Sequence, residues 1–103
     1  MFNLRQALLA TTAAVAFAGA AQAQDACDTV RFSDVGWTDI TVTTSATKQI
    51  LTALGYEVDV KVLGVPVTFA SLEAGDIDVF LGNWMPGQEG AIRPYLDAGS
   101  IEV

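Results

Sequence analysis

The sequence predicts an α/β fold built on a doubly wound parallel sheet. Three segments alternate apolar and polar residues over strand lengths, and helical spacing of apolar residues fills the intervals between them. Right-handed crossovers at these lengths make the three strands parallel and place the first strand in the middle of the sheet. The length of 103 residues allows one modest domain.

Each predicted strand is rich in β-branched or aromatic residues and is followed by a glycine that ends it. The strands and their glycines are residues 30–34 with Gly36, residues 56–63 with Gly64, and residues 77–81 with Gly82.

The first predicted helix spans residues 39–54, with Asp39 or Thr38 as its N-cap and Gly55 as its C-terminal stop. Residues 40–43 alone favour a strand, but the length and the two end signals favour a helix. The apolar positions at helical spacing are Val42, Ala46, Ile50 and Ala53 or Leu54.

Two shorter helices are predicted further along the chain. One covers residues 67–74 and ends at Gly75, and the other covers residues 88–97 and is interrupted by Pro94. Residues 100–103 resemble the start of a strand.

The N-terminal segment has the pattern of a secretory signal peptide. Arg5 precedes an apolar run over residues 7–21, and an Ala-Gln-Ala sequence ends at Ala23. The run is shorter than the roughly 20 residues that cross a bilayer, which disfavours a transmembrane helix. We therefore expect residues 1–23 to be removed, leaving an exported chain of residues 24–103 with no membrane insertion of its own.

Charge and residue usage exclude several function classes. The net charge of -7 leaves no basic surface for nucleic acid or for an anionic membrane. The chain has no histidine and a single cysteine, Cys27, so it cannot form a Ser-His-Asp site, a His-ligated zinc site or a cysteine cluster. No catalytic residue, metal or cofactor is expected, and Cys27 is either a free thiol or one whose partner lies outside this chain.

Ligands of open α/β sheets bind beyond the carboxyl ends of the strands. Trp37 follows the first predicted strand and Trp84 follows the third, so the two indoles are expected to face one crevice. Indole faces attract quaternary ammonium groups, and Asp39 would add a negative charge that favours a hydroxyl-bearing cation over a zwitterion. The alternatives are that each tryptophan covers the core and that Asp39 serves as an N-cap.

Three stretches carry a resemblance to a known family: VRFSDVGWTD at residues 30–39, LGY at 54–56 and GDIDVFLGNWMP at 75–86. They resemble the periplasmic substrate-binding proteins of ABC transporters for choline and glycine betaine, with the choline-binding branch the most similar. The likeness extends from about Val30 to Val103.

This resemblance implies a type II periplasmic-binding-protein fold, in which two α/β lobes close on the ligand about a hinge. Residues 24–103 would form the N-terminal part of lobe 1. Trp37 and Trp84 would be two walls of an aromatic box and Asp39 its acidic group. Family members are longer, so the other walls, the second lobe and a partner for Cys27 are expected beyond Val103.

The expected function is that of an exported solute-binding component of an ABC importer. It would bind choline or a related quaternary amine and deliver it to a membrane permease from the periplasm. One alternative is a preference for glycine betaine or proline betaine. Others are a truncated product without activity and a small exported α/β enzyme that acts on a cationic substrate.

Overall fold

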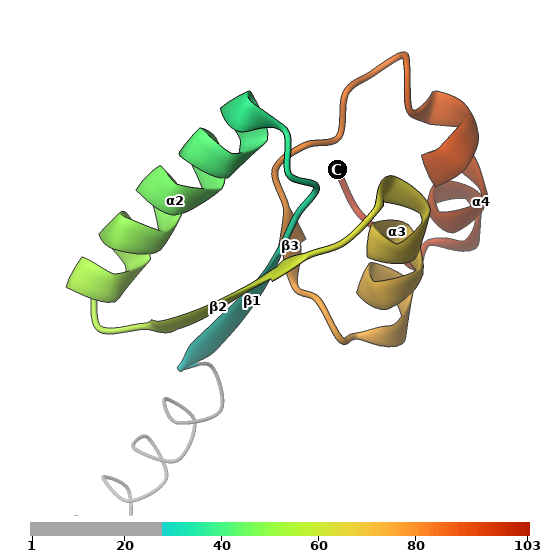
Figure 1. Ribbon diagram of the computed structural model, residues 1–103. Coiled ribbons are helices and arrows are strands. Elements are labelled where there is room, and N and C mark those ends of the chain that lie inside the picture. The colour runs from blue at the N-terminus through green and yellow to red at the C-terminus, as the bar shows by residue number, and fades with distance from the viewer. Residues whose placement is uncertain (1–27) are drawn as a thin grey trace, which may run out of the picture.

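The computed structural model describes residues 28–103, so the predicted signal peptide and Cys27 lie outside the described residues. Strands and helices alternate along this part of the chain (Figure 1). The elements are β1 (Thr29–Asp34), α2 (Thr38–Ala53), β2 (Glu57–Val62), α3 (Val65–Ala74), β3 (Val79–Phe80) and α4 (Glu89–Ala98).

The three strands form one parallel sheet in the order β2-β1-β3. β1 pairs with β2 along its full length and with β3 through Phe32 and Ser33. Helix α2 lies on one side of the sheet, and α3 and α4 lie on the other (Figure 1). The predicted doubly wound α/β fold with the first strand in the middle is therefore confirmed.

The core is formed where the sheet meets the helices. The Phe69 ring of α3 is 1% exposed and meets the Phe80 ring edge to face, with 6.0 Å between centroids. The buried hydroxyls of Ser33 and Thr68 lie 2.6 Å apart, so each satisfies the other. The buried apolar side chains are Phe32, Ile40, Phe69, Ile77 and Ile92.

Helix α2 turns a different face to the sheet than the sequence predicted. Ile40 and Thr44 are buried, whereas Val42 and Ile50 of the predicted apolar face are each 63% exposed. The Thr41 hydroxyl donates a hydrogen bond to Asp34 at the end of β1, which fixes the rotation of the first turn.

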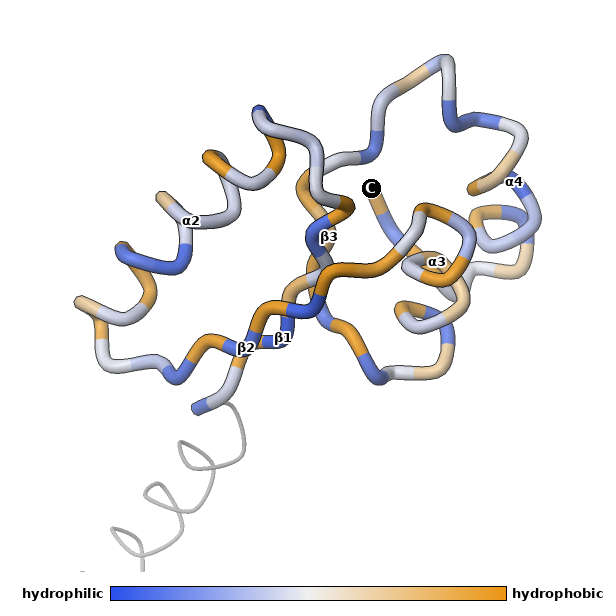
Figure 2. Tube along the Cα trace, viewed as in Figure 1, coloured by the Kyte–Doolittle hydropathy of each residue, from blue (hydrophilic) through white to orange (hydrophobic). Residues whose placement is uncertain are grey.

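Along β2 the hydropathy alternates as predicted (Figure 2).

The start of α2 also differs from the prediction. The N-cap is Trp37, with no side-chain capping hydrogen bond, and both Thr38 and Asp39 lie within the first turn. Gly36, at φ 79°, completes a tight turn after β1, and the helix therefore begins earlier than predicted. Asp39 remains in the first turn, where the helix dipole favours a negative charge.

The C-terminal third departs from prediction in two places. Helix α4 continues through Pro94. Proline has no backbone N–H, so one hydrogen bond of the helix is missing there, and the exposed ring does not disturb the packing. Residues 100–103 form no strand. Val79 and Phe80 of β3 and the segment Ile101–Val103 both line a cavity of about 180 Å³. Within residues 28–103, no helix is both long and apolar enough to span a bilayer.

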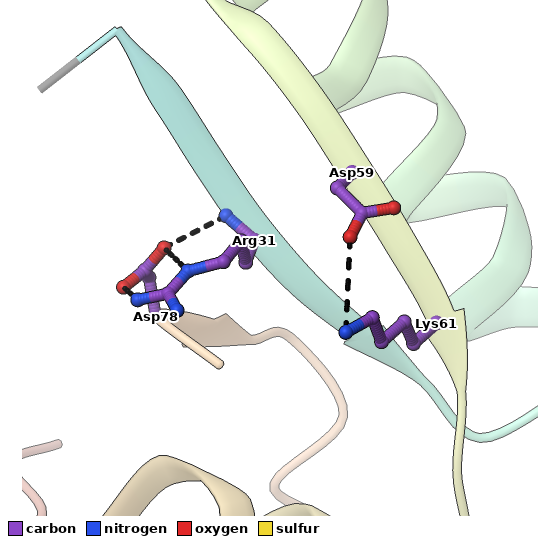
Figure 3. A network of polar contacts seen from close by, with 4 residues as sticks. All are labelled: Arg31, Asp59, Lys61 and Asp78. Atoms are coloured by element: carbon purple, nitrogen blue, oxygen red, sulfur yellow. Dashed lines mark hydrogen bonds and ion pairs between the residues drawn. The ribbon is translucent and has the colours of Figure 1, made fainter. Parts of the chain in front are cut away.

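A bidentate ion pair between Arg31 and Asp78 connects β1 to the segment before β3. The Arg31 guanidinium donates to both carboxylate oxygens of Asp78, at 3.0 and 2.8 Å, and the Arg31 backbone N–H donates to the same carboxylate (Figure 3). The side-chain and backbone hydrogen bonds from Arg31 lower the pKa of the Asp78 carboxyl.

This ion pair makes stability depend on pH in the acid range. Because the pKa of Asp78 is lower in the folded chain, its contribution is present above the unfolded-state pKa near 4 and is lost as the pH falls through the folded value. Urea midpoints of the chain and of Asp78→Asn should therefore converge as the pH is lowered below about 4. The exposed Asp97→Asn variant serves as the control, and a difference that grows on acidification would contradict this account.

Candidate functional site

Two loops extend from the carboxyl ends of adjacent strands and lie side by side. Figure 1 shows the loop between β1 and α2 next to the loop that follows β3. The first carries Trp37 and the second carries Trp84. Both loops are therefore at the edge of the sheet where open α/β folds bind ligands.

The Trp37 loop is anchored by Asp34, the last residue of β1, which is only 5% exposed. Its Oδ1 accepts the Gly36 backbone N–H at 2.8 Å, and its Oδ2 accepts the Thr41 hydroxyl at 2.8 Å. The Trp37 carbonyl accepts the Thr41 N–H at 2.8 Å. The turn that presents the indole is thus hydrogen-bonded on both sides.

The Trp84 loop is anchored by Gln88, which is 9% exposed. Its side-chain Nε2 donates to the Gly82 carbonyl at 2.8 Å, and its backbone N–H donates to the Trp84 carbonyl at 2.8 Å. The side-chain oxygen and nitrogen of Asn83 are also buried, and neither has a hydrogen-bond partner among residues 28–103.

The two indoles meet at the surface. The ring centroids of Trp37 and Trp84 are 6.2 Å apart, and the ring planes are inclined at 71°. Trp37 is 42% exposed and Trp84 is 57% exposed, so neither ring is enclosed in the core. The structure brings both tryptophans to one place at the sheet edge, and their exposure argues against the alternative in which each covers the core. The ligand crevice between them stays a prediction.

Asp39 lies in the exposed first turn of α2, two residues after Trp37. Its backbone carbonyl accepts the Thr43 hydroxyl at 2.9 Å. The structure therefore brings Asp39 to the same end of the sheet as the indole pair.

The described part of the chain offers no group of three or more His, Cys, Asp or Glu side chains arranged to hold a metal ion. The cavity beside β3 is not lined by Trp37, Asp39 or Trp84, but Asn83, the residue before Trp84, does line it. What the sheet edge presents is a partly exposed aromatic pair with a carboxylate on the adjoining helical turn.

Sequence reasoning missed Asp34 and Gln88, the two residues that fasten the loops. A signal for Asp34 was present, because an aspartate at a strand end with glycine two residues later is a common side-chain turn. Gln88 had no comparable signal. Its bond to Gly82 depends on how the whole loop after β3 folds back.

Comparison with known proteins gives a consistent set of similarities. A family model described as the substrate binding domain of an ABC-type glycine betaine transport system matches residues 28–103. An uncharacterized protein, ORF1, of Chromohalobacter salexigens is 50% identical over 76 residues, which is 74% of this chain and 49% of that protein.

Two solved structures are also similar. One is an ABC-transporter choline-binding protein in complex with choline, 65% identical, with a TM-score of 0.72 over 73% of this chain. The other is such a protein in an unliganded semi-closed conformation, 66% identical, with a TM-score of 0.67 over 72% of this chain. The chain spans 26% of each of these structures and about half of the curated relative.

These similarities confirm the resemblance found in the sequence and match the fold to part of a larger α/β binding protein. They also confirm that the chain is not an enzyme, because the matched family consists of transport-system binding domains. The chain belongs to the family of substrate-binding domains of ABC-type glycine betaine transport systems.

Proposed function

We propose that this chain forms part of a periplasmic receptor for choline or a closely related quaternary amine. In this proposal residues 1–23 are a cleaved signal peptide and residues 24–103 are the N-terminal part of lobe 1. The receptor delivers its ligand to the membrane permease of an ABC importer and performs no chemistry. Supporting observations are the family match and the high identity to a protein solved with choline.

The observation that carries the proposal is the contact between Trp37 and Trp84. The two ring planes are inclined at 71° with their centroids 6.2 Å apart, and both residues are partly exposed; we call this pair the aromatic corner. A methylated ammonium group against an indole face gains about 0.5–2 kcal/mol. Such a group has no N–H to donate, so it depends on surfaces of this kind rather than on hydrogen bonds.

Asp39 supplies selectivity in this proposal. In this proposal the carboxylate of Asp39, in the first turn of α2 two residues after Trp37, attracts the cation and repels a ligand that has its own carboxylate. Closure of a second lobe would exclude water and strengthen both effects, because the local dielectric constant would fall. Choline would therefore bind more tightly than glycine betaine.

The test uses a hybrid in which residues 28–103 replace the matching segment of the choline-binding protein of known structure. In calorimetric titrations the hybrid should bind choline more tightly than glycine betaine. Asp39→Asn should weaken choline binding by about three- to tenfold, because roughly 1 kcal/mol of charge attraction is lost. It should also reduce the ratio between the affinities for choline and for glycine betaine.

The matched control is Asp76→Asn, which removes the same charge in the turn before β3, at the opposite end of the strand from Trp84. It should change the affinity for choline and the affinity for glycine betaine by no more than about twofold each. Glycine betaine binding as tightly as choline in the unsubstituted hybrid would reject the role given to Asp39.

A further inference from the structure

Each tryptophan loop is held by one buried polar side chain, although the tryptophans themselves are exposed. Asp34 holds the Trp37 loop and Gln88 holds the Trp84 loop. The two side chains are 5% and 9% exposed, so both are almost fully removed from solvent. Buried polar groups are costly unless their hydrogen bonds are made, which ties each loop to these bonds. Both carboxylate oxygens of Asp34 and the amide nitrogen of Gln88 are paired, whereas the buried Oε1 of Gln88 has no partner among residues 28–103.

Asp34 acts on both sides of Trp37. One carboxylate oxygen holds the backbone N–H of Gly36, which sits at φ 79°, and the other holds the hydroxyl of Thr41 in the first turn of α2. The carbonyl of Asp34 accepts the N–H of Leu63 at 2.8 Å, which ties the same residue to the end of β2. The residues before and after the indole are therefore fixed to the sheet through one residue.

Gln88 acts on the other indole in the same manner. Its side-chain amide holds the Gly82 carbonyl, and its backbone N–H holds the Trp84 carbonyl. A Cβ atom at Gly82 would lie 2.7 Å from the Phe80 ring and 3.2 Å from Ile40. The backbone thus passes very close to the core at the point where Gln88 fastens it, so the start of the loop has little room to shift.

We infer that Asp34 and Gln88 are positioning residues that hold the indoles of Trp37 and Trp84 in contact before any ligand arrives. Neither side chain meets the ligand. Their effect is to preorganise the aromatic corner, so that ligand binding does not have to order the two loops. The inference rests on the proposed function for its purpose, but the indole geometry is measurable without ligand.

The experiment uses the whole chain without ligand and records near-ultraviolet circular dichroism, to which contacting indoles contribute strongly. Asp34→Ala should remove at least about half of the indole signal, because the edge-to-face contact is lost. Gln88→Met, which keeps the side-chain length but has no donor, should do the same. Far-ultraviolet spectra should stay unchanged, and acrylamide should quench the tryptophan fluorescence of both variants more efficiently.

A conservative variant separates positioning from charge. Asp34→Asn keeps an oxygen for the Gly36 N–H, and its amide group can donate to the Thr41 hydroxyl. It should therefore retain most of the indole signal. Unfolding of Asp34→Asn, or loss of its signal to the extent seen in Asp34→Ala, would overturn the inference.

The matched control is Ser33→Ala. Ser33 precedes Asp34 in β1, and the substitution removes its buried hydrogen bond to Thr68. It should lower stability while leaving the indole signal unchanged. A loss of signal in Ser33→Ala as large as in Asp34→Ala would show general loosening and contradict a positioning role. If the hybrid fails to bind choline while the indole signals of the variants change as expected, the proposed function is rejected and the positioning role of Asp34 and Gln88 stands.

Discussion

Replacing Trp84 by alanine in the hybrid protein should weaken choline binding by more than about tenfold, which corresponds to about 1.4 kcal/mol. The substitution removes one wall of the aromatic corner and also leaves Trp37 without its edge-to-face partner. A desolvated cation–π contact alone is worth about 2 kcal/mol, so the loss should be evident in calorimetric titration.

Met85→Ala is the matched control for Trp84→Ala. Met85 is the next residue of the same loop, is 47% exposed and is also apolar, but it has no aromatic face. Its removal should change choline affinity by less than about threefold. Equal losses in the two variants would mean that the loop contributes general apolar contact rather than an indole face. Unfolding of Trp84→Ala would restore the interpretation in which this tryptophan covers the core.

Phe69→Ala should destabilise the fold more than any surface substitution. Phe69 is 1% exposed, and its ring lies 6.0 Å from the ring centroids of both Phe80 and Tyr95. Removing a buried phenylalanine side chain costs about 3–5 kcal/mol. The free energy of unfolding of a domain of this size is about 5–15 kcal/mol in total, so the variant should lose a large fraction of its stability.

Thermal unfolding followed by circular dichroism measures this effect. A loss of about 3 kcal/mol lowers the midpoint by more than about 10 °C in a domain of 60–100 residues. Val67→Ala, on the same helix but 53% exposed, is the control and should shift the midpoint by only a few degrees. Similar midpoints for the two variants would show that Phe69 does not organise the core.

The sequence was sufficient to predict the fold because its local signals agree with one another. The alternation around Phe32 and along Val58 and Val60 predicted paired strands, and β1 and β2 formed at those positions. The sequence did not predict which face of α2 is buried. Apolar residues cover a wide arc of that helix, and the bond from Thr41 to Asp34 selects the side with Ile40 and Thr44.

Long-range pairs were beyond the reach of sequence reasoning. Arg31 and Asp78 are 47 positions apart, and their contact depends on the register between β1 and the segment before β3. The tryptophan pair could be predicted because strand order alone brings Trp37 and Trp84 to one edge. The residues that fix their geometry could not, since the bond from Gln88 to Gly82 arises only when the loop after β3 has folded.

The most direct measurement compares choline with its neutral carbon analogue, in which a tert-butyl group replaces the trimethylammonium group, by calorimetric titration of the hybrid. The two ligands have nearly the same shape, so the difference in affinity isolates the attraction of positive charge to the indole faces and Asp39. We expect choline to bind at least about tenfold more tightly. Equal affinities would contradict the account, because the site would then be recognising shape and apolar surface rather than a cation.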